Sequence, residues 1–249
     1  MVSPKQVRLI EFGSDCAFRN MALDRRLLAL GEQSPDTAFL RFYTWDPPAL
    51  SLGHFETADA IDRQRAERDG VEMVRRPTGG RVVLHKDDLT YTLVVPRERR
   101  MTAHELYAEI SGSIVDGLAE LGIKLETASG PLERQAPGEK PCFLAETRHE
   151  IVHAGRKVIG SAQRLGRRAI LQHGTIPIGR GYLEVVDYLV CDETERKRLA
   201  DEMAKRSACL EDIACRKLDP GDVARHLTRA FLALLGGKVA SLPAVEAVR

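Results

Sequence analysis

Residues 149–178, HEIVHAGRKVIGSAQRLGRRAILQHGTIPI, constrain the possible fold more than any other stretch of the chain. The segment is interpreted as three consecutive strands, with a tight turn at Ala154-Gly155 and a second turn over residues 165–168. Strands that follow one another through such short turns pair in antiparallel fashion. The segment therefore favours an antiparallel sheet.

The middle strand of this segment holds a lysine on a rigid element rather than on a loop. A period of two places alternate side chains on opposite faces of a strand. One face is predicted to carry Lys157, Ser161 and Gln163, and the other Val158, Gly160 and Ala162.

The remaining segments add further strands and surrounding helices. A helix is predicted over residues 103–121, where apolar residues recur every three or four positions. The strand predictions are residues 37–45, 71–75, 82–84 and 89–95, and the other helix predictions are residues 20–30, 193–206 and 220–235. Strands dominate the middle of the chain, so the fold class is α+β, with a mixed, mostly antiparallel sheet flanked by helices.

The chain length and composition predict a single domain over residues 1–249, with a helical C-terminal part over residues 193–249. Its 37 Lys and Arg nearly balance its 36 Asp and Glu, which argues against nucleic-acid or membrane partners. The five cysteines form no CxxC pair, so neither a disulfide framework nor a metal site is expected. The first residues lack the apolar core of a signal peptide, and a cytoplasmic location is expected.

The loop RRPTGGRVVLH, residues 75–85, indicates an anion-binding site. Its glycine pair allows the main chain to approach a ligand closely, and Arg75, Arg76 and Arg81 carry forked donors suited to a carboxylate or a phosphate. An equally plausible interpretation is a Gly-Gly hairpin with solvated arginines. The loop matches neither the GxxxxGK[ST] nor the GxGxxG pattern.

Several other side chains are candidates for chemistry, each with a structural alternative. Cys142 follows a Pro- and Gly-rich segment that is expected to expose it, although a lone cysteine is more often an inert small residue. Lys157 can polarise a carbonyl oxygen or simply extend to solvent from a strand edge. His85 and His173 can act as general bases or as hydrogen-bonded core residues. The turn arginines Arg164, Arg167 and Arg168 can meet an acidic partner or remain solvated.

Six motifs together resemble one known family. The chain is similar to the biotin/lipoate protein ligase superfamily, and within it to the lipoate-protein ligase A branch that includes the cysteine-dependent (LipM-type) octanoyltransferases. The motifs keep the order of the family and span roughly residues 20–178. They are NMALD (20–24), WDPPALSLGHF (45–55), RRPTGGRVVLHKDDLTYTLVVP (75–96), CF (142–143), GRKVIGSAQR (155–164) and ILQHGTI (170–176).

The resemblance implies a catalytic domain of the class II aminoacyl-tRNA synthetase and biotin synthetase type. It implies that the arginine-glycine loop and the strand lysine line one pocket for a medium-chain acyl group. Cys142 matches the position of the transferase nucleophile, and Lys157 matches the lysine that binds the carboxyl or thioester oxygen. The substrate-binding residues carried over or placed beside them are Arg75, Arg76, Thr78, Gly79, Gly80, Arg81, His85, Gly160, Ser161, Ala162, Gln163, His173 and Gly174.

The implied activity is octanoyl transfer from an acyl carrier protein thioester, through an acyl-Cys142 enzyme, to a lysine of a lipoyl-accepting protein. Such acceptors include the glycine cleavage H protein and dehydrogenase E2 subunits. This route is expected to need no cofactor. The main alternative is a lipoate-protein ligase that uses ATP and Mg, although ligases of this family usually carry a third glycine where Arg81 stands. A non-catalytic binder of lipoyl domains and a biotin ligase are weaker alternatives.

Overall fold

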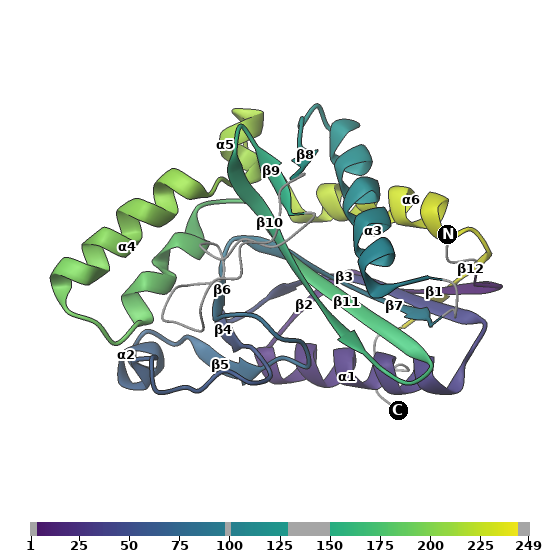
Figure 1. Cartoon of the computed structure of the whole chain (residues 1–249), viewed down its shortest axis with the longest axis horizontal. Helices are drawn as coiled ribbons and strands as arrows, with labels where there is room; N and C mark the ends of the chain where they lie inside the picture. The colour runs from purple at the N-terminus through teal and green to yellow at the C-terminus, as the bar shows by residue number, and fades with distance from the viewer. Residues whose placement is uncertain (1–3, 98–100, 129–149, 244–249) are drawn as a thin grey trace.

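One long sheet runs through the middle of the molecule (Figure 1). The structure is a computed structural model that describes residues 4–97, 101–128 and 150–243. Within these residues the sheet has nine strands. In spatial order they are β12 (Lys238–Leu242), β1 (Gln6–Ile10), β3 (Thr37–Trp45), β7 (Asp88–Pro96), β11 (Ala169–Pro177), β10 (Arg156–Leu165), β9 (Ile151–His153) and β8 (Glu126–Thr127), while β2 (Gly13–Asp15) pairs with β3.

Most neighbouring strands of this sheet are antiparallel. The strands from β3 through β7, β11, β10 and β9 to β8 pair antiparallel in a continuous run. Parallel pairs occur between β1 and β12, β1 and β3, and β2 and β3. The predicted mixed, mostly antiparallel sheet is confirmed. The turn between β9 and β10 also falls at Ala154 and Gly155 as predicted, and both have positive φ, 48° and 73°.

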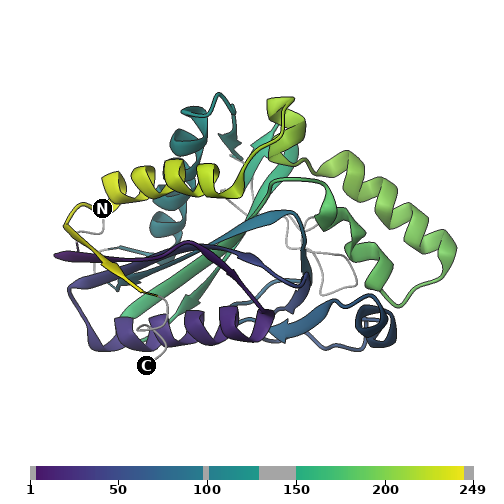
Figure 2. The same cartoon turned by 180° about the vertical axis from the view of Figure 1, so that it is seen from behind.

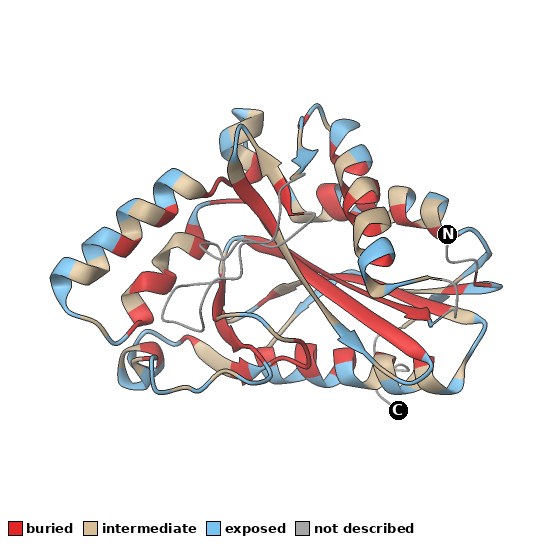
Figure 3. Cartoon of the chain, viewed as in Figure 1, coloured by how far each residue is buried: buried red, intermediate tan, exposed pale blue. Residues whose placement is uncertain are grey.

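Helices cover both faces of the long sheet (Figure 2). On one face lie α3 (Ala103–Ala119) and α6 (Pro220–Leu235), whose apolar stripes join the largest core cluster of the described residues. On the other face α1 (Ala17–Gln33) buries Leu23 and Leu27 against the sheet. With a helix layer on each side, the central strands β7 and β11 are buried along their whole length (Figure 3).

A second, three-stranded sheet carries the arginine-glycine loop. Here β4 (Ala49–Leu52) lies between β5 (Glu72–Arg75) and β6 (Val83–His85), pairing parallel with β5 and antiparallel with β6. The hairpin interpretation of the loop is therefore wrong, because β4 separates the two strands that flank it. An apolar cluster joins this sheet to α4 (Glu193–Arg206) and to the 3-10 helix η2 (Gly181–Tyr188), and α2 (Arg63–Arg68) packs beside β5.

The C-terminal part agrees with the sequence prediction in its two long helices and departs from it near its end. The helices α4 and α6 have the predicted bounds, and the Asp219 side chain caps α6 by accepting a hydrogen bond from the Asp222 amide. The short helix α5 (Leu210–Ala214) falls within the predicted helical part, whereas the 3-10 helix η2 lies before it and is not predicted. The helical assignment of residues 238–242 is wrong, because these residues form β12, whose partner β1 lies more than 200 positions away in the sequence.

The structure bears only in part on two further predictions, the exposure of Cys142 and the absence of a membrane span. Cys142 and the preceding segment 129–141 lie outside the described residues. Among the helices that the structure does describe, none is long and apolar enough to cross a membrane.

Phe231 on α6 offers a test of the packing between the helices and the sheet. Its ring is fully buried and contacts Phe42 edge-on and Tyr91, with centroid distances of 5.6 and 5.5 Å. We expect Phe231→Ala to lower the free energy of unfolding by about 3–5 kcal/mol, since it leaves a cavity in the core. Chemical denaturation would measure this. Arg225→Ala, an exposed position on the same helix, should change stability by less than about 0.5 kcal/mol; equal effects would contradict the packing described here.

Candidate functional site

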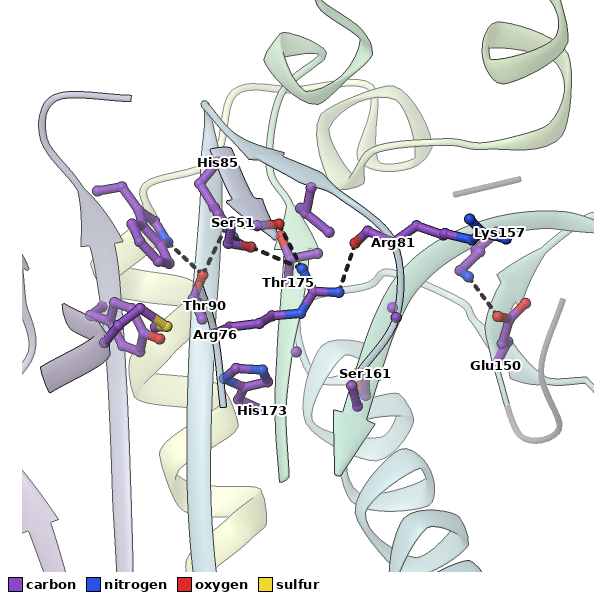
Figure 4. Close-up of a pocket in the computed structure, with 18 residues that line it drawn as sticks. Ser51, Arg76, Arg81, His85, Thr90, Glu150, Lys157, Ser161, His173 and Thr175 are labelled. Atoms are coloured by element: carbon purple, nitrogen blue, oxygen red, sulfur yellow. Dashed lines mark hydrogen bonds and ion pairs between the residues drawn. The ribbon is translucent and has the colours of Figure 1, made fainter. Parts of the chain in front are cut away.

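A cavity of about 200 Å³ opens between the two sheets (Figure 4). Its walls come from α1, β3, the small sheet, the loop after β5, and strands β7, β10 and β11. The cavity thus gathers segments that are far apart in the sequence. The predicted site residues that line it are Arg76, Gly80, Arg81, His85, Lys157, Gly160, Ser161, Ala162, His173 and Gly174.

The other predicted site residues within the described ranges lie around the cavity without lining it, whereas Cys142 lies outside those ranges. Thr78 and Gly79 belong to the loop behind its wall, and Arg75 points to the segment after β4. Gln163 donates hydrogen bonds to the Gln172 side chain and the Ala103 carbonyl, at 2.8 and 2.9 Å. These side chains support neighbouring structure.

The Arg76 guanidinium shapes the arginine-glycine loop from within. It is buried and donates hydrogen bonds to the main-chain carbonyls of Ser51, Gly79 and Arg81, at 2.6, 2.8 and 2.7 Å. Buried carbonyls need such donors. Gly80 has a φ of 92°, and a Cβ there would lie 2.8 Å from Arg76 Nη2, so the loop closes around its own arginine.

The other two arginines of the loop have different surroundings. Arg75 donates to the carbonyls of Gly53, His54 and Glu56, at 2.7, 3.1 and 2.7 Å, and so fixes the turn after β4. The Arg81 side chain makes no hydrogen bond or ion pair with any residue of the described ranges, and it lines the cavity on the same side as Lys157 (Figure 4). Of the three predicted anion-binding guanidinium groups, Arg81 is the one left available to a ligand.

A buried polar chain links the loop to the long sheet. The fully buried Asp24 accepts hydrogen bonds from Arg41, Tyr43 and Thr92 and lies 3.2 Å from His173 Nδ1. His173 Nε2 lies 2.5 Å from the Thr78 hydroxyl. Thr78 therefore occupies the imidazole nitrogen that a general base would use, and this favours the core-residue interpretation of His173.

The protonation states of Asp24 and His173 follow from their burial and from the hydrogen bonds between them and their neighbours. Burial lowers the pKa of His173, against the opposing effect of the Asp24 carboxylate. Burial raises the pKa of Asp24, but hydrogen bonding to His173 and the charge of Arg41 outweigh it and lower that pKa overall. A neutral His173 then donates from Nδ1 to Asp24 and accepts from Thr78 at Nε2.

A second chain of the same kind supports the opposite side of the loop. His85 Nδ1 lies 2.8 Å from Asp88 and its Nε2 lies 2.8 Å from the Ser51 hydroxyl, and its ring stacks on Trp45 at 4.0 Å. This arrangement resembles an activated serine. However, Ser51 sits within β4, is 1% exposed and also accepts a hydrogen bond from Arg76. The contacts fit a structural link better than a nucleophile.

Lys157 enters the cavity from β10 and forms a buried ion pair. Its Nζ lies 2.5 Å from a carboxylate oxygen of Glu150 (Figure 4). The pairing of β10 with β9 shifts register between Lys157 and Ile159, which places Lys157 at the cavity while Ile159 packs in the core. The expected alternation of side chains between the two faces of β10 is therefore interrupted next to Lys157.

Small residues on β10 and β11 leave room for a ligand. Gly174 pairs with Ser161, and a Cβ at Gly174 would lie 2.5 Å from the Ser161 hydroxyl and 2.6 Å from the Tyr91 ring. The Tyr91 hydroxyl also hydrogen-bonds Ser161 at 2.8 Å, and burial raises the pKa of Tyr91 to about 12. Glycine at 174 thus keeps this wall thin and its hydroxyl groups paired.

Several lining residues are missed by the sequence analysis. Most of them fall inside motifs that were considered only for the family resemblance, so the motifs themselves contained the signal. Tyr43 and Glu150 stand outside every motif and have no such signal. The missed residues are Met21, Tyr43, Trp45, Ser51, Val83, Thr90, Glu150 and Thr175.

Comparison with known proteins identifies the family to which this chain belongs. A family model described as the lipoyl protein ligase A/B catalytic domain matches residues 16–232, most of the chain. The chain belongs to this family. A curated octanoyltransferase LipM of Exiguobacterium sibiricum is 36% identical over 222 residues, covering 85% of this chain and 80% of the relative. The octanoyltransferase LipM of Moorella thermoacetica is 33% identical, covering 91% and 85%.

A solved structure supports the same family fold. The bipartite lipoate protein ligase of Thermoplasma acidophilum, studied with its E2 lipoyl domain, superposes with a TM-score of 0.78 at 21% identity. The match covers 100% of this chain and 91% of that one. The predicted resemblance to the lipoate ligase and octanoyltransferase family and the predicted fold class are both confirmed.

Arg76 should be essential to the shape of the family's loop in this chain. We expect Arg76→Lys to lower the free energy of unfolding by about 2–4 kcal/mol, because one compact ammonium cannot reach carbonyls that Arg76 binds through two separate nitrogens, and each unpaired buried group costs about 1–3 kcal/mol. Arg75→Lys is the matched control, since its carbonyl partners are more exposed, and should cost less than about 1 kcal/mol. Urea denaturation would compare them; equal losses would contradict the structural role of Arg76.

The buried His173 should make stability depend on pH. Its pKa is lowered in the folded protein, so the unfolded chain binds a proton more readily. Its contribution is complete above the unfolded pKa of about 6.5 and declines as pH falls below that value, by at most about 1.4 kcal/mol per pH unit. We expect the difference in unfolding free energy between wild type and His173→Gln to shrink from pH 7 to pH 5. A constant difference would show that His173 titrates normally.

Proposed function

We propose that this chain is a protein octanoyltransferase, which moves an octanoyl group from acyl carrier protein to a lysine of a lipoyl-accepting protein. The glycine cleavage H protein and dehydrogenase E2 subunits are acceptors of this class. The observation that carries the proposal is the similarity to curated octanoyltransferases over most of both chains, at 33–36% identity. The bipartite ligase studied with its E2 lipoyl domain supports the class of acceptor.

The shape and charge of the cavity fit this substrate. Lys157 and Arg81 lie at one side, whereas His85, with Trp45 stacked on it, lies at the other (Figure 4). We assign the apolar and aromatic wall to the acyl tail and the cationic side to the thioester. Arg81 then faces the polar part of the donor, and the ammonium of Lys157 donates a hydrogen bond to the carbonyl oxygen as it becomes an oxyanion.

The proposed reaction has two acyl transfers. The thiolate of Cys142 attacks the thioester carbonyl, the bond to the carrier sulfur breaks, and the carrier leaves as a thiolate that takes up a proton. The neutral amine of the acceptor lysine then attacks the acyl-cysteine. The new C–N bond forms, the amine loses a proton, and the Cys142 thiolate is released. The role of Cys142 stays a prediction of the family resemblance.

The proposed route uses the energy of the donor thioester. Amide formation from a thioester is downhill, so the reaction as proposed requires neither ATP nor a metal ion. Adenylate formation from free lipoate would instead require ATP and Mg. The donor requirement therefore separates the transferase from the ligase.

A donor comparison tests the proposal. Purified protein and an apo lipoyl domain would receive either octanoyl-acyl carrier protein or free lipoate with ATP and Mg, with acceptor modification followed by mass spectrometry. We expect octanoyl transfer without ATP and an octanoyl adduct of the enzyme. Cys142→Ala should abolish both, while Cys215→Ala, an exposed cysteine outside the cavity, should abolish neither. Turnover that needs ATP and survives Cys142→Ala would establish the ligase.

The variant Lys157→Ala tests the proposed role of this lysine in the same assay. Loss of one oxyanion donor typically lowers kcat by about 10²–10³-fold. We expect Lys157→Ala to lower kcat by that factor while the protein retains its fold by circular dichroism. Unchanged turnover in this variant would remove Lys157 from the reaction.

A further inference from the structure

The charges that line the cavity are unequal. Three cationic side chains, Arg76, Arg81 and Lys157, face it, and among the described lining residues Glu150 is the one carboxylate. Like charges that share one cavity repel one another, and burial removes part of the hydration that would weaken this repulsion. An anion next to Lys157 offsets part of it.

Glu150 is placed to be that anion. Its carboxylate lies 2.5 Å from Lys157 Nζ, and the two residues are only 5% and 7% exposed. The main chain of each partner is also fixed. The Glu150 carbonyl accepts a hydrogen bond from the Ala128 amide at 2.8 Å, and the Lys157 carbonyl accepts one from the Ala208 amide at 2.9 Å. The pair is thus held from two sides before any substrate arrives.

The position of this pair argues for a role beyond packing. A buried ion pair stabilises a protein little, and apolar residues of similar size often replace it without loss. Here both partners line the cavity. The carboxylate occupies one direction of the ammonium, and an ammonium has three N–H donors. A pair that only filled the core would not need to face the substrate cavity.

We propose that Glu150 is a positioning residue for Lys157: its carboxylate balances the positive charge and orients the side chain so that an N–H points to the acyl oxygen. This inference rests on the proposed octanoyl transfer for its kinetic consequence, but the charge pairing itself can be measured without turnover. Glu150 is not a reacting group in the two transfers described above, and its effect is expected to pass entirely through Lys157.

A double-mutant cycle tests whether Glu150 acts through Lys157. We expect Glu150→Gln to lower kcat about 10- to 100-fold, the kinetic equivalent of one charged hydrogen bond, with KM changed less than about threefold. Glu150→Asp, which keeps the charge, should recover part of the loss. In the Lys157→Ala background, Glu150→Gln should have no further effect. A full Glu150→Gln effect in that background, or none in wild type, would overturn the inference.

Trace labelling with acetic anhydride tests the pairing independently of activity. A lysine side chain held in an ion pair with a carboxylate reacts slowly, so Glu150→Gln should increase acetylation of Lys157, measured by peptide mass spectrometry at fixed pH. The matched control is the ion pair of Lys86 with Glu184, at 2.6 Å and outside this cavity. Glu184→Gln should increase labelling of Lys86 and leave Lys157 unchanged.

The two experiments separate the possible failures. If wild type transfers no octanoyl group, the proposed function fails, while increased Lys157 labelling in Glu150→Gln still supports the pairing. If transfer occurs but Glu150→Gln changes neither kcat nor labelling, the role of Glu150 fails and the proposed function stands. Circular dichroism and the melting temperature of each variant establish that the fold is retained.

Discussion

The whole candidate site depends on one buried guanidinium. Arg76 donates to carbonyls of β4 and of the loop that follows β5, and so ties the small sheet to the wall of the cavity. The loop has no strand partner of its own in the described structure, because β4 lies between the two strands that flank it. Without a donor at this point, the buried carbonyl of Ser51 and the part-buried carbonyls of Gly79 and Arg81 would lose this hydrogen-bond partner, which is unfavourable.

Two polar chains complete the frame around this group. One reaches from Asp88 through His85 to Ser51 on the small sheet, and the other from Asp24 through His173 to Thr78 in the loop. The cavity therefore lies at the junction of the two sheets, where these hydrogen bonds act together with a small apolar cluster in which Met21, Tyr43 and Trp45 meet Ala49 and Val74. Lys157 and Glu150 close the remaining side.

Local sequence pattern was sufficient to predict most helices and strands, but it did not predict which strands pair with one another. The strand over residues 37–45 and the helices over residues 193–206 and 220–235 have the predicted bounds. The strand is a short run rich in apolar and aromatic residues, the helices have amphipathic periodicity and capping residues, and these signals act within a few positions. The insertion of β4 between β5 and β6, and the strand at 238–242, depend on partners remote in sequence. No local pattern of residues identifies such a partner.

The same distinction holds for the candidate site. Spacing in the sequence indicated a loop rich in arginine and a lysine on a strand, and both reach the cavity. It did not reveal that the guanidinium groups of Arg75 and Arg76 bind main-chain carbonyls, because spacing does not distinguish a ligand from the backbone as the acceptor. Glu150 was missed for a related reason, since only the fold brings it next to Lys157.

Because Arg76 binds main-chain carbonyls, its partners do not depend on which side chains the loop carries. Carbonyl oxygens are present whatever the side chain, so substitutions at most loop positions leave these acceptors in place. The constraint falls instead on the donor, and on Gly53, where a side-chain carbon would lie 1.9 Å from the Gly80 carbonyl oxygen. Mutational tolerance should therefore be uneven across this short segment, with the strictest limits at Arg76 and at the glycines that pack against the loop.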